Sequence, residues 1–235
     1  MQAKIYNLNL EILQNEHYFD AVISKDMSNN YYWSDEWSEE LYIKLAKLGF
    51  ISTSYDTKEG LVLLPELQFE YSILDFPHLH ISKKVKKMLA QKSYKLTFNT
   101  AFEDVIEKIA EQHKDNWFKD EYMELIRKLF EKKSDTFEMM SVELFSSQTD
   151  TLVAGEIGYK IGKTYTSLTG FSSREKEHRN SGTLQLVLLA HYLEAENFSF
   201  WNLGHPHMEY KKRLGAVTYE REKFLQRWQK AISLN

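Results

Sequence analysis

Three strand-like segments that follow one another in the second half of the chain constrain the fold more than any other feature. They are rich in apolar and β-branched residues, and only short polar turns separate them: 137–145, 152–161 and 164–171. Strands joined by such short turns pair in antiparallel fashion. Helical patterns lie before and after this run. Helices mixed with an antiparallel run predict an α+β fold and exclude a doubly wound parallel sheet.

The segments on either side of this run extend the pattern. A strand is expected at 94–98, and Thr100-Ala101-Phe102-Glu103 has the form of a capping box that begins a helix. Apolar residues at helical or alternating spacing predict the other elements. These are helices at 102–109, 122–129 and 184–195, and strands at 198–203 and 217–224.

The N-terminal part, residues 1–72, shows shorter patterns and is expected to form a small α+β subdomain. Ser38 is expected to begin a helix that Gly49 ends. Residues 51–55 and 61–64 have the pattern of two strands joined by a turn. Residues 73–235 are expected to form the larger domain, although no Pro-, Gly- or Ser-rich linker marks the boundary.

The residue types exclude several classes of protein. The chain contains no Cys, which excludes a disulfide framework, a thiolate zinc site and a Cys nucleophile. No apolar run approaches the roughly 18 residues of a membrane span. The N-terminus has no basic leader followed by a small-residue cleavage site. We therefore expect a cytoplasmic protein that is not bound to a membrane.

Charge is distributed unevenly along the chain. The formal net charge is −4, yet residues 76–102 contain six lysines and no acidic residue, which leaves −10 for the remainder. Such a patch attracts phosphate-rich partners. A solvated helix face is the alternative, but a chain that needed only solubility would intersperse its charges. Ser82 is expected to begin the short helix that carries four of the lysines, with Val85, Met88 and Leu89 facing inward. These four, Lys83, Lys84, Lys86 and Lys87, are the candidate contacts to a phosphate-rich partner.

Several short motifs occur in a fixed order from about residue 41 onward. They are Leu48-Gly49-Phe50-Ile51, Leu79-His80-Ile81-Ser82 before the lysines, Asn99-Thr100-Ala101-Phe102, Trp117, Ser141-Val142-Glu143, Leu152-Val153-Ala154-Gly155 and Leu214-Gly215-Ala216. In this order the chain resembles the leucyl/phenylalanyl-tRNA–protein transferases. These bacterial enzymes move an amino acid from aminoacyl-tRNA to the N-terminus of a protein.

The resemblance carries implications for fold and partners. It implies a GNAT-like (acetyltransferase-like) mixed sheet flanked by helices over residues 73–235. It implies aminoacyl-tRNA as co-substrate with no other cofactor, and the N-terminal amine of a protein as acceptor, in a modification of the N-end-rule kind. The four lysines Lys83, Lys84, Lys86 and Lys87 are then the candidate tRNA contacts. It leaves the amino acid, the acceptor protein and the oligomeric state open, with a monomer as the expectation.

Two acidic positions of the family are replaced in this chain. Leu168, within Ser167-Leu168-Thr169-Gly170-Phe171, stands where the family has Glu. Asn202 stands where the family has Asp, and Gly204 replaces a Gln. Asn202 can donate and accept hydrogen bonds, but it cannot serve as a carboxylate base.

Transfer remains chemically possible without that base. The ester is already activated, so positioning and stabilisation of the carbonyl oxygen can supply much of the rate. The catalytic candidates are Asn202, Tyr165 and Thr169.

The resemblance also implies an apolar pocket that holds the Leu or Phe side chain of the aminoacyl group. Its substrate-binding residues are Trp117, Glu156, Leu168, Gly170, Gln185, Leu188 and Gly204. A buried, unpaired carboxylate costs several kcal/mol. Glu156 is therefore expected to face another way or to meet a cation or a polar side chain, and a simple preference for Leu or Phe is not expected. Trp117 is expected to stack on the terminal adenine of tRNA, with closure of the core as the alternative.

A different reaction class stays open. Arg179-Asn180-Ser181-Gly182-Thr183-Leu184 partly matches the phosphate loop with which GNAT proteins hold acetyl-CoA at a helix N-terminus. The bulk of Leu184 is expected to obstruct close approach of that ligand. An acyl-CoA-dependent N-acyltransferase is the alternative, followed by a non-catalytic tRNA- or peptide-binding relative. His205 and His207 could contribute to a metal site, but no third ligand is evident, so none is expected.

Overall fold

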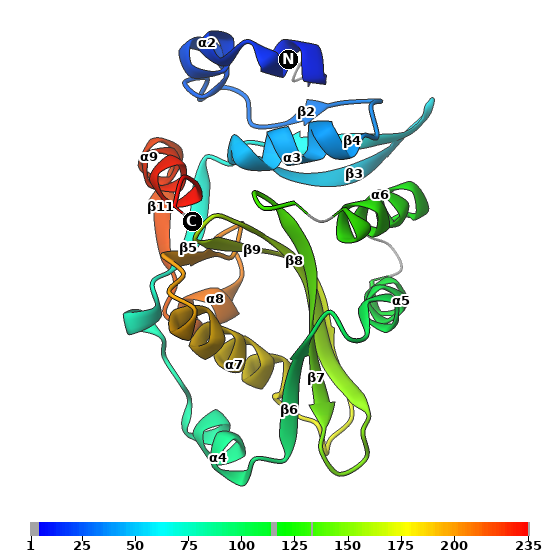
Figure 1. Ribbon diagram of the computed structural model, residues 1–235, viewed down its shortest axis with the longest axis vertical. Helices are drawn as coiled ribbons and strands as arrows, with labels where there is room; N and C mark the ends of the chain where they lie inside the picture. The colour runs from blue at the N-terminus through cyan, green and yellow to red at the C-terminus, as the bar shows by residue number, and fades with distance from the viewer. Residues whose placement is uncertain (1–4, 114–116, 133, 235) are drawn as a thin grey trace.

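The computed structural model describes residues 5–113, 117–132 and 134–234. Within this part of the chain, seven strands form one sheet in the order β11-β5-β10-β9-β8-β7-β6, and helices lie against both of its faces (Figure 1). The strands of this sheet are β5 (Glu70–Leu74), β6 (Tyr94–Phe98), β7 (Glu138–Ser146), β8 (Leu152–Ile161), β9 (Thr164–Ser172), β10 (Phe200–Asn202) and β11 (Val217–Glu220).

The sheet is mixed. Strands β6 to β9 pair with one another in antiparallel fashion, β10 runs parallel to β9, and β5 is antiparallel to both β10 and β11. The helix between β9 and β10 provides the crossover that a parallel pair requires. The predicted α+β fold, with a GNAT-like mixed sheet flanked by helices, is confirmed at the level of this architecture.

Helices on the two faces bury separate cores. One core lies beneath α5 (Phe102–Gln112), α6 (Asp120–Glu131) and α9 (Arg221–Ile232) and extends to the N-terminal elements. The other lies beneath α7 (Ser181–Ala195) and includes Val85 of α4 (Lys83–Gln91) and Leu214 of α8 (Glu209–Leu214). In α5 the apolar residues recur at helical spacing, and all four are buried: Phe102, Val105, Ile106 and Ile109.

The N-terminal elements lie at one end of the large sheet (Figure 1). They are β1 (Tyr6–Asn7), α1 (Leu10–Gln14), α2 (Glu16–Tyr18), η1 (Phe19–Ile23), β2 (Tyr32–Trp33), α3 (Glu39–Lys47), β3 (Ile51–Thr57) and β4 (Gly60–Glu66). The short helix η2 (Phe76–His78) comes later in the chain, directly after β5. The Ser38 side chain accepts a hydrogen bond from the N–H of Leu41, and Gly49 takes a positive φ of 92° after the helix. Both predicted helix signals are confirmed.

The predicted domain boundary at residue 73 falls inside β5. This strand lies within the large sheet, between β10 and β11. The core also crosses the boundary, because the hydroxyl groups of Tyr42 in α3 and Tyr122 in α6 lie 3.1 Å apart. The division into 1–72 and 73–235 stays a prediction.

Two predicted local features are wrong. Ala101, not Thr100, stands at the N-cap of α5, and no side chain caps the helix. The Thr100 hydroxyl instead donates to the buried carboxylate of Glu143 at 3.1 Å, which removes it from the helix terminus. The strand expected at 217–224 ends at Glu220, and α9 begins at the next residue. Burial of Phe224 and Trp228, four residues apart, favours the helix.

Within the described residues, no helix has both the length and the apolar character needed to cross a membrane.

Candidate active site where β9 and β10 separate

Strands β9 and β10 run side by side for only a short distance. Residues 164–166 of β9 pair with 200–202 of β10, whereas β9 continues to Ser172 and there pairs with β8 alone. Opposite consecutive residues 157 and 158 of β8 stand Thr169 and Ser167, so Leu168 is an extra, bulged residue. A bulge bends its strand. The separation therefore leaves residues 167–170 of β9 partly exposed.

A buried hydrogen-bond network lies at the point of separation, on the α7 side of the sheet. The carboxylate of Glu156 in β8 accepts hydrogen bonds from three side chains. The Tyr165 hydroxyl donates at 2.9 Å, the Ser167 hydroxyl at 2.7 Å and the Gln185 amide at 3.0 Å. The Trp201 indole N–H of β10 donates to Ser167 at 2.9 Å. The network thus joins β8, β9, β10 and α7.

Burial sets the electrostatics of this network. Glu156 is 4% exposed, and this desolvation raises the pKa of its carboxyl group, while its three hydrogen bonds act in the opposite direction. Burial, with a further contribution from Glu156, raises the pKa of Tyr210 to about 12, although the residue as a whole is 45% exposed. At Gly170 a Cβ atom would lie 2.9 Å from the Cβ of Glu156, so glycine leaves room for the carboxylate side chain.

Asn202 and Gly204 lie at the end of β10, where the strands separate. Asn202 is 1% exposed, and its amide is engaged within the protein. Its Oδ1 accepts from the N–H of Gly204 at 2.9 Å, and its Nδ2 donates to the Thr166 hydroxyl at 3.4 Å. The Gly204 carbonyl accepts from the N–H of Ser72 at 2.7 Å. These contacts fix the chain as it leaves β10.

Lys211 is a component of this region that sequence reasoning missed. Its buried ammonium group donates to the carbonyls of Leu203 and His205, the latter at 2.7 Å. Burial lowers the pKa of Lys211 to about 8. The sequence offers only the basic run 211–213, which gives no sign that the first lysine turns inward.

The other predicted residues lie on different parts of the fold. Leu168 and Thr169 are partly exposed on β9, and Leu188 is partly exposed on α7. The Trp117 ring stands edge-on to that of Tyr122, with centroids 5.1 Å apart, and its carbonyl accepts from the Ser54 hydroxyl. This is the packing expected of a Trp that closes the core, while stacking on adenine stays a prediction. The roles assigned to all these residues stay predictions.

The lysine-rich helix α4 presents its cations to solvent. All four predicted tRNA contacts are exposed, and within the described residues none of them forms an ion pair. Val85 is buried, and Met88 and Leu89 pack against the core beneath α7. The predicted inward face of this helix is therefore confirmed.

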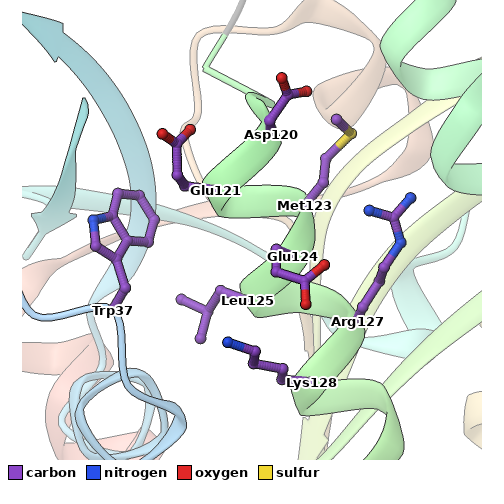
Figure 2. Close-up of a pocket in the computed structure, with 8 residues that line it drawn as sticks. All are labelled: Trp37, Asp120, Glu121, Met123, Glu124, Leu125, Arg127 and Lys128. Atoms are coloured by element: carbon purple, nitrogen blue, oxygen red, sulfur yellow. The ribbon is translucent and has the colours of Figure 1, made fainter. Parts of the chain in front are cut away.

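Two further features contain none of the residues predicted for the site. A hollow of about 520 Å³ lies between Trp37 and α6, and Figure 2 shows the indole ring on one side and the α6 side chains on the other. Separately, ligand atoms of Glu175, Glu177 and His178 lie within 4.8 Å of one another. Both glutamates are exposed, and exposed carboxylates gather often without an ion, so we assign no metal to them.

The fold and the network together define an α+β protein with a buried polar site where two parallel strands separate. A model of the family described as leucyl/phenylalanyl-tRNA protein transferase matches residues 73–229, which include every strand and helix of this site. The chain belongs to this family.

Curated relatives agree with this assignment. Proteins named leucyl/phenylalanyl-tRNA–protein transferase from Maridesulfovibrio salexigens, Flavobacterium johnsoniae and Proteus mirabilis are 27%, 28% and 27% identical over 68%, 65% and 68% of this chain. The matched stretch spans about two thirds of each relative, namely 64%, 69% and 66% of its length.

Solved structures with a similar chain path are more distant. The crystal structure of FemX is 11% identical, with a TM-score of 0.48 over 88% of this chain and 76% of that one. The structure of L-PGS from Bacillus licheniformis is 11% identical, with a TM-score of 0.46 over 93% of this chain and 76% of that one. Likeness at this level gives no information about activity.

Proposed function

We propose that the protein transfers an amino acid from aminoacyl-tRNA to the N-terminal amine of an acceptor protein. The observation that carries this proposal is the family match, since residues 73–229 include β8, β9, α7 and β10. Aminoacyl-tRNA is made in the cytoplasm, and we place the reaction there.

The chemistry requires little beyond positioning. The neutral amine nitrogen attacks the ester carbonyl carbon, and the bond between that carbon and the ribose oxygen breaks. One proton leaves the nitrogen, and the ribose oxygen gains one. Backbone N–H groups of β9 between Ser167 and Gly170, past its pairing with β10, are the donors that we assign to the carbonyl oxygen. The partly exposed Thr169 hydroxyl lies in the same segment.

The other two catalytic candidates, Asn202 and Tyr165, act through other groups in this scheme and do not contact the reacting atoms. The side chains of Asn202 and Tyr165 are buried and hydrogen-bonded inside the protein. We therefore assign them to positioning: Asn202 fixes the end of β10, and Tyr165 fixes Glu156. No carboxylate base is required, because the α-amine of a peptide has a pKa of about 7.7–8.0 and is partly neutral at physiological pH.

We propose that the preference for the transferred amino acid differs from Leu and Phe. The support is the Glu156 network. The resemblance implies an apolar pocket in this region, whereas the network places polar side chains there. Transfer should be compared for tRNA charged with Leu, Phe, Met, Lys or Arg. Clean selection of Leu and Phe would defeat this part of the proposal.

The direct test is transfer of labelled amino acids from total charged tRNA to peptides with varied first residues. We expect label on peptides with a free N-terminal amine and none on the same peptides after acetylation. Absence of transfer to every free peptide, with the protein folded, would refute the proposed function.

A second candidate is an acyl-CoA-dependent N-acyltransferase, and one observation favours it. Leu184 is 1% exposed and packs in the core beneath α7, so it does not stand over the start of that helix. The expectation that Leu184 obstructs the phosphate loop is therefore wrong. Acetyl-CoA should raise the melting temperature if this candidate is right, whereas puromycin or aminoacyl-tRNA should do so if the first is right.

A further inference from the structure

A second buried carboxylate, outside the Glu156 network, joins the N-terminal elements to the loop that follows β10. It belongs to Glu66, the last residue of β4, which is 6% exposed. Its Oε1 accepts a hydrogen bond from the Asn30 amide at 2.7 Å and lies 3.1 Å from Nε2 of His205. Its Oε2 accepts from Nε2 of Gln68 at 3.4 Å. No step of the proposed transfer uses this carboxylate.

The Glu66 carboxylate fixes the orientation of two of these neighbours. An ionised carboxylate accepts hydrogen bonds and donates none. The Gln68 amide therefore turns its NH2 group toward Glu66 and its Oε1 away from it. The neutral imidazole of His205 carries its proton on Nε2 for the same reason, so Nδ1 keeps a free lone pair. The two atoms that do not face the carboxylate are thus both hydrogen-bond acceptors.

Neither acceptor has a donor. Oε1 of Gln68 and Nδ1 of His205 are buried and, in the part of the chain that the structure describes, form no hydrogen bond. Gln68 as a whole is 2% exposed. Burying a polar atom without a partner costs its desolvation, and such atoms are rare in folded proteins. A ligand that brings two N–H or O–H groups would satisfy both.

This pair of acceptors lies beside the candidate active site. A Cβ atom at Gly204 would lie 3.3 Å from Cδ1 of Ile51 and 4.0 Å from Nε2 of Gln68. The N–H of Gly204 donates to Asn202 at the end of β10. His205 follows in the loop between β10 and α8, and its side chain is 41% exposed. Exposed side chains change rotamer rapidly, so a ligand can enter on the His205 side.

The charges around the pair offset one another. Two buried cations, Lys211 and Arg221, donate to the backbone carbonyls of the two acceptor residues at 2.7 and 3.1 Å. The carboxylates of Glu66 and Asp26 both act on Arg221. Two positive and two negative groups cancel formally, so they do not select an ammonium ion over a neutral amine.

We propose that Oε1 of Gln68 and Nδ1 of His205 hold the N-terminal amine of the acceptor protein, and that Glu66 positions them. A neutral primary amine has two N–H groups and one lone pair. The two acceptors can take both N–H groups and leave the lone pair for attack on the ester carbonyl. The assignment rests on the proposed function, because that reaction supplies the amine. Neither residue removes a proton, so the proton balance of the transfer is unchanged.

The test measures peptide binding without any transfer step. The probe is a short peptide with a fluorescent label at its C-terminus, prepared with a free α-amine and in N-acetylated form. Its binding to the full chain is followed by anisotropy at pH 6.5 and 8.5. Gln68→Met and His205→Phe each remove one acceptor. His207→Phe is the matched control, because the exposed His207 ring stacks on that of His205 with centroids 5.0 Å apart.

The expected result is a preference for the free amine that depends on both acceptors. The wild type should bind the free peptide more tightly than the acetylated one, and more so at pH 8.5, where the amine is mostly neutral. Gln68→Met and His205→Phe should each weaken binding of the free peptide by about 2–10-fold, the effect of one hydrogen bond. Binding of the acetylated peptide should change by less than about 2-fold, and His207→Phe should change neither.

Two further variants separate a specific role from a structural one. His205→Asn should retain most of the preference, because its Oδ1 is an acceptor at the side-chain position of Nδ1. Glu66→Gln should reduce the ratio of free to acetylated binding, since an amide at this position no longer enforces either orientation. Melting temperatures check that each variant is folded. If Gln68→Met does not fold, His205→Phe, at a partly exposed position, carries the test.

Three outcomes would overturn the proposal. Equal binding of the free and acetylated peptides by the wild type would leave the two acceptors to water alone. Equal losses in His205→Phe and His207→Phe would mean that the loop, and not the acceptor atom, matters. Tighter binding at pH 6.5 together with competition by ammonium chloride would assign the site to a cation.

This result is independent of the test of the proposed function. Absence of transfer, with the preference for the free amine intact, would refute the proposed function and leave the amine site standing. Transfer without that preference would do the reverse.

Discussion

At the scale of single residues, Glu156 determines how the site responds to pH. Burial raises its pKa above 4.5 in the folded state, so the native protein binds this proton more tightly than the unfolded chain does. Glu156 therefore lowers the free energy of unfolding as the pH rises from about 4.5 through its folded pKa.

Glu156→Gln removes this titration. The free energy of unfolding of the wild type should fall relative to that of the variant as the pH rises through this range. Chemical denaturation at several pH values from about 4.5 upward measures this difference. Parallel pH profiles for the two proteins would contradict the burial of an ionisable carboxyl group at this position.

Lys211 has the opposite pH dependence. Its pKa is lowered from 10.5 to about 8, so the unfolded chain binds more protons between these values and stability should rise with pH there. Lys211→Met should abolish this rise. At neutral pH it should also destabilise the protein by about 1–3 kcal/mol, because the carbonyls of Leu203 and His205 lose their donor. Lys212→Met, at an exposed neighbour, is the control.

At the scale of elements, β8 and β9 lie in close contact beside the Glu156 network, and this contact leads us to a prediction for Gly170. A Cβ atom at Gly170 would lie 2.6 Å from the Gly155 carbonyl oxygen and 2.9 Å from the Cβ of Glu156. Gly170→Ala should therefore destabilise the protein by about 1–3 kcal/mol, since the backbone must shift. At Gly182 the nearest contact is 3.0 Å, with the Ser172 side chain, so Gly182→Ala should cost less. Thermal melts of both variants check this order.

Elements with a regular pattern could be predicted from the sequence. The strands β7, β8 and β9 and the helix α7 follow from apolar alternation or apolar density, and their observed bounds differ from the predicted ones by at most three residues. The start of α5 could not be predicted. The Thr100 hydroxyl, which the capping-box motif places at the N-cap, instead forms a tertiary hydrogen bond with Glu143. A strand-like run ahead of α9 concealed the helix that begins at Arg221.

The site could be predicted only in part. The sequence indicated that Glu156 either faces another way or meets a cation or a polar side chain, and in the structure it meets three polar side chains. Its partners Tyr165, Ser167 and Gln185 are 9, 11 and 29 residues away and lie on two further elements, so no local pattern joins them. The bulge at Leu168 depends on register between strands, which the composition of β9 does not reveal.

At the scale of the whole molecule, the two parts of the chain share the large sheet and the core beneath α5, α6 and α9. Residues 70–72 of β5 pair with 218–220 of β11, and Tyr42 meets Tyr122. A fragment of residues 73–235 should therefore lack a native-like cooperative transition, whereas the full chain should melt in a single step. Circular dichroism melts of both proteins test this. Independent cooperative folding of the fragment would contradict a shared core.

The central claim is that positioning, without a carboxylate base, supports aminoacyl transfer at the separation of β9 and β10. Its most direct test is the pH dependence of single-turnover transfer from aminoacyl-tRNA to a peptide, for the wild type and for Asn202→Asp. The wild-type rate should rise with the neutral fraction of the acceptor amine, with an apparent pKa of about 7.7–8.0. The pH–rate profile of Asn202→Asp should be shifted from that of the wild type only if the new carboxylate accepts the proton that the amine loses. No transfer at any pH, or a wild-type profile governed by a group that titrates well below the amine, would contradict the claim.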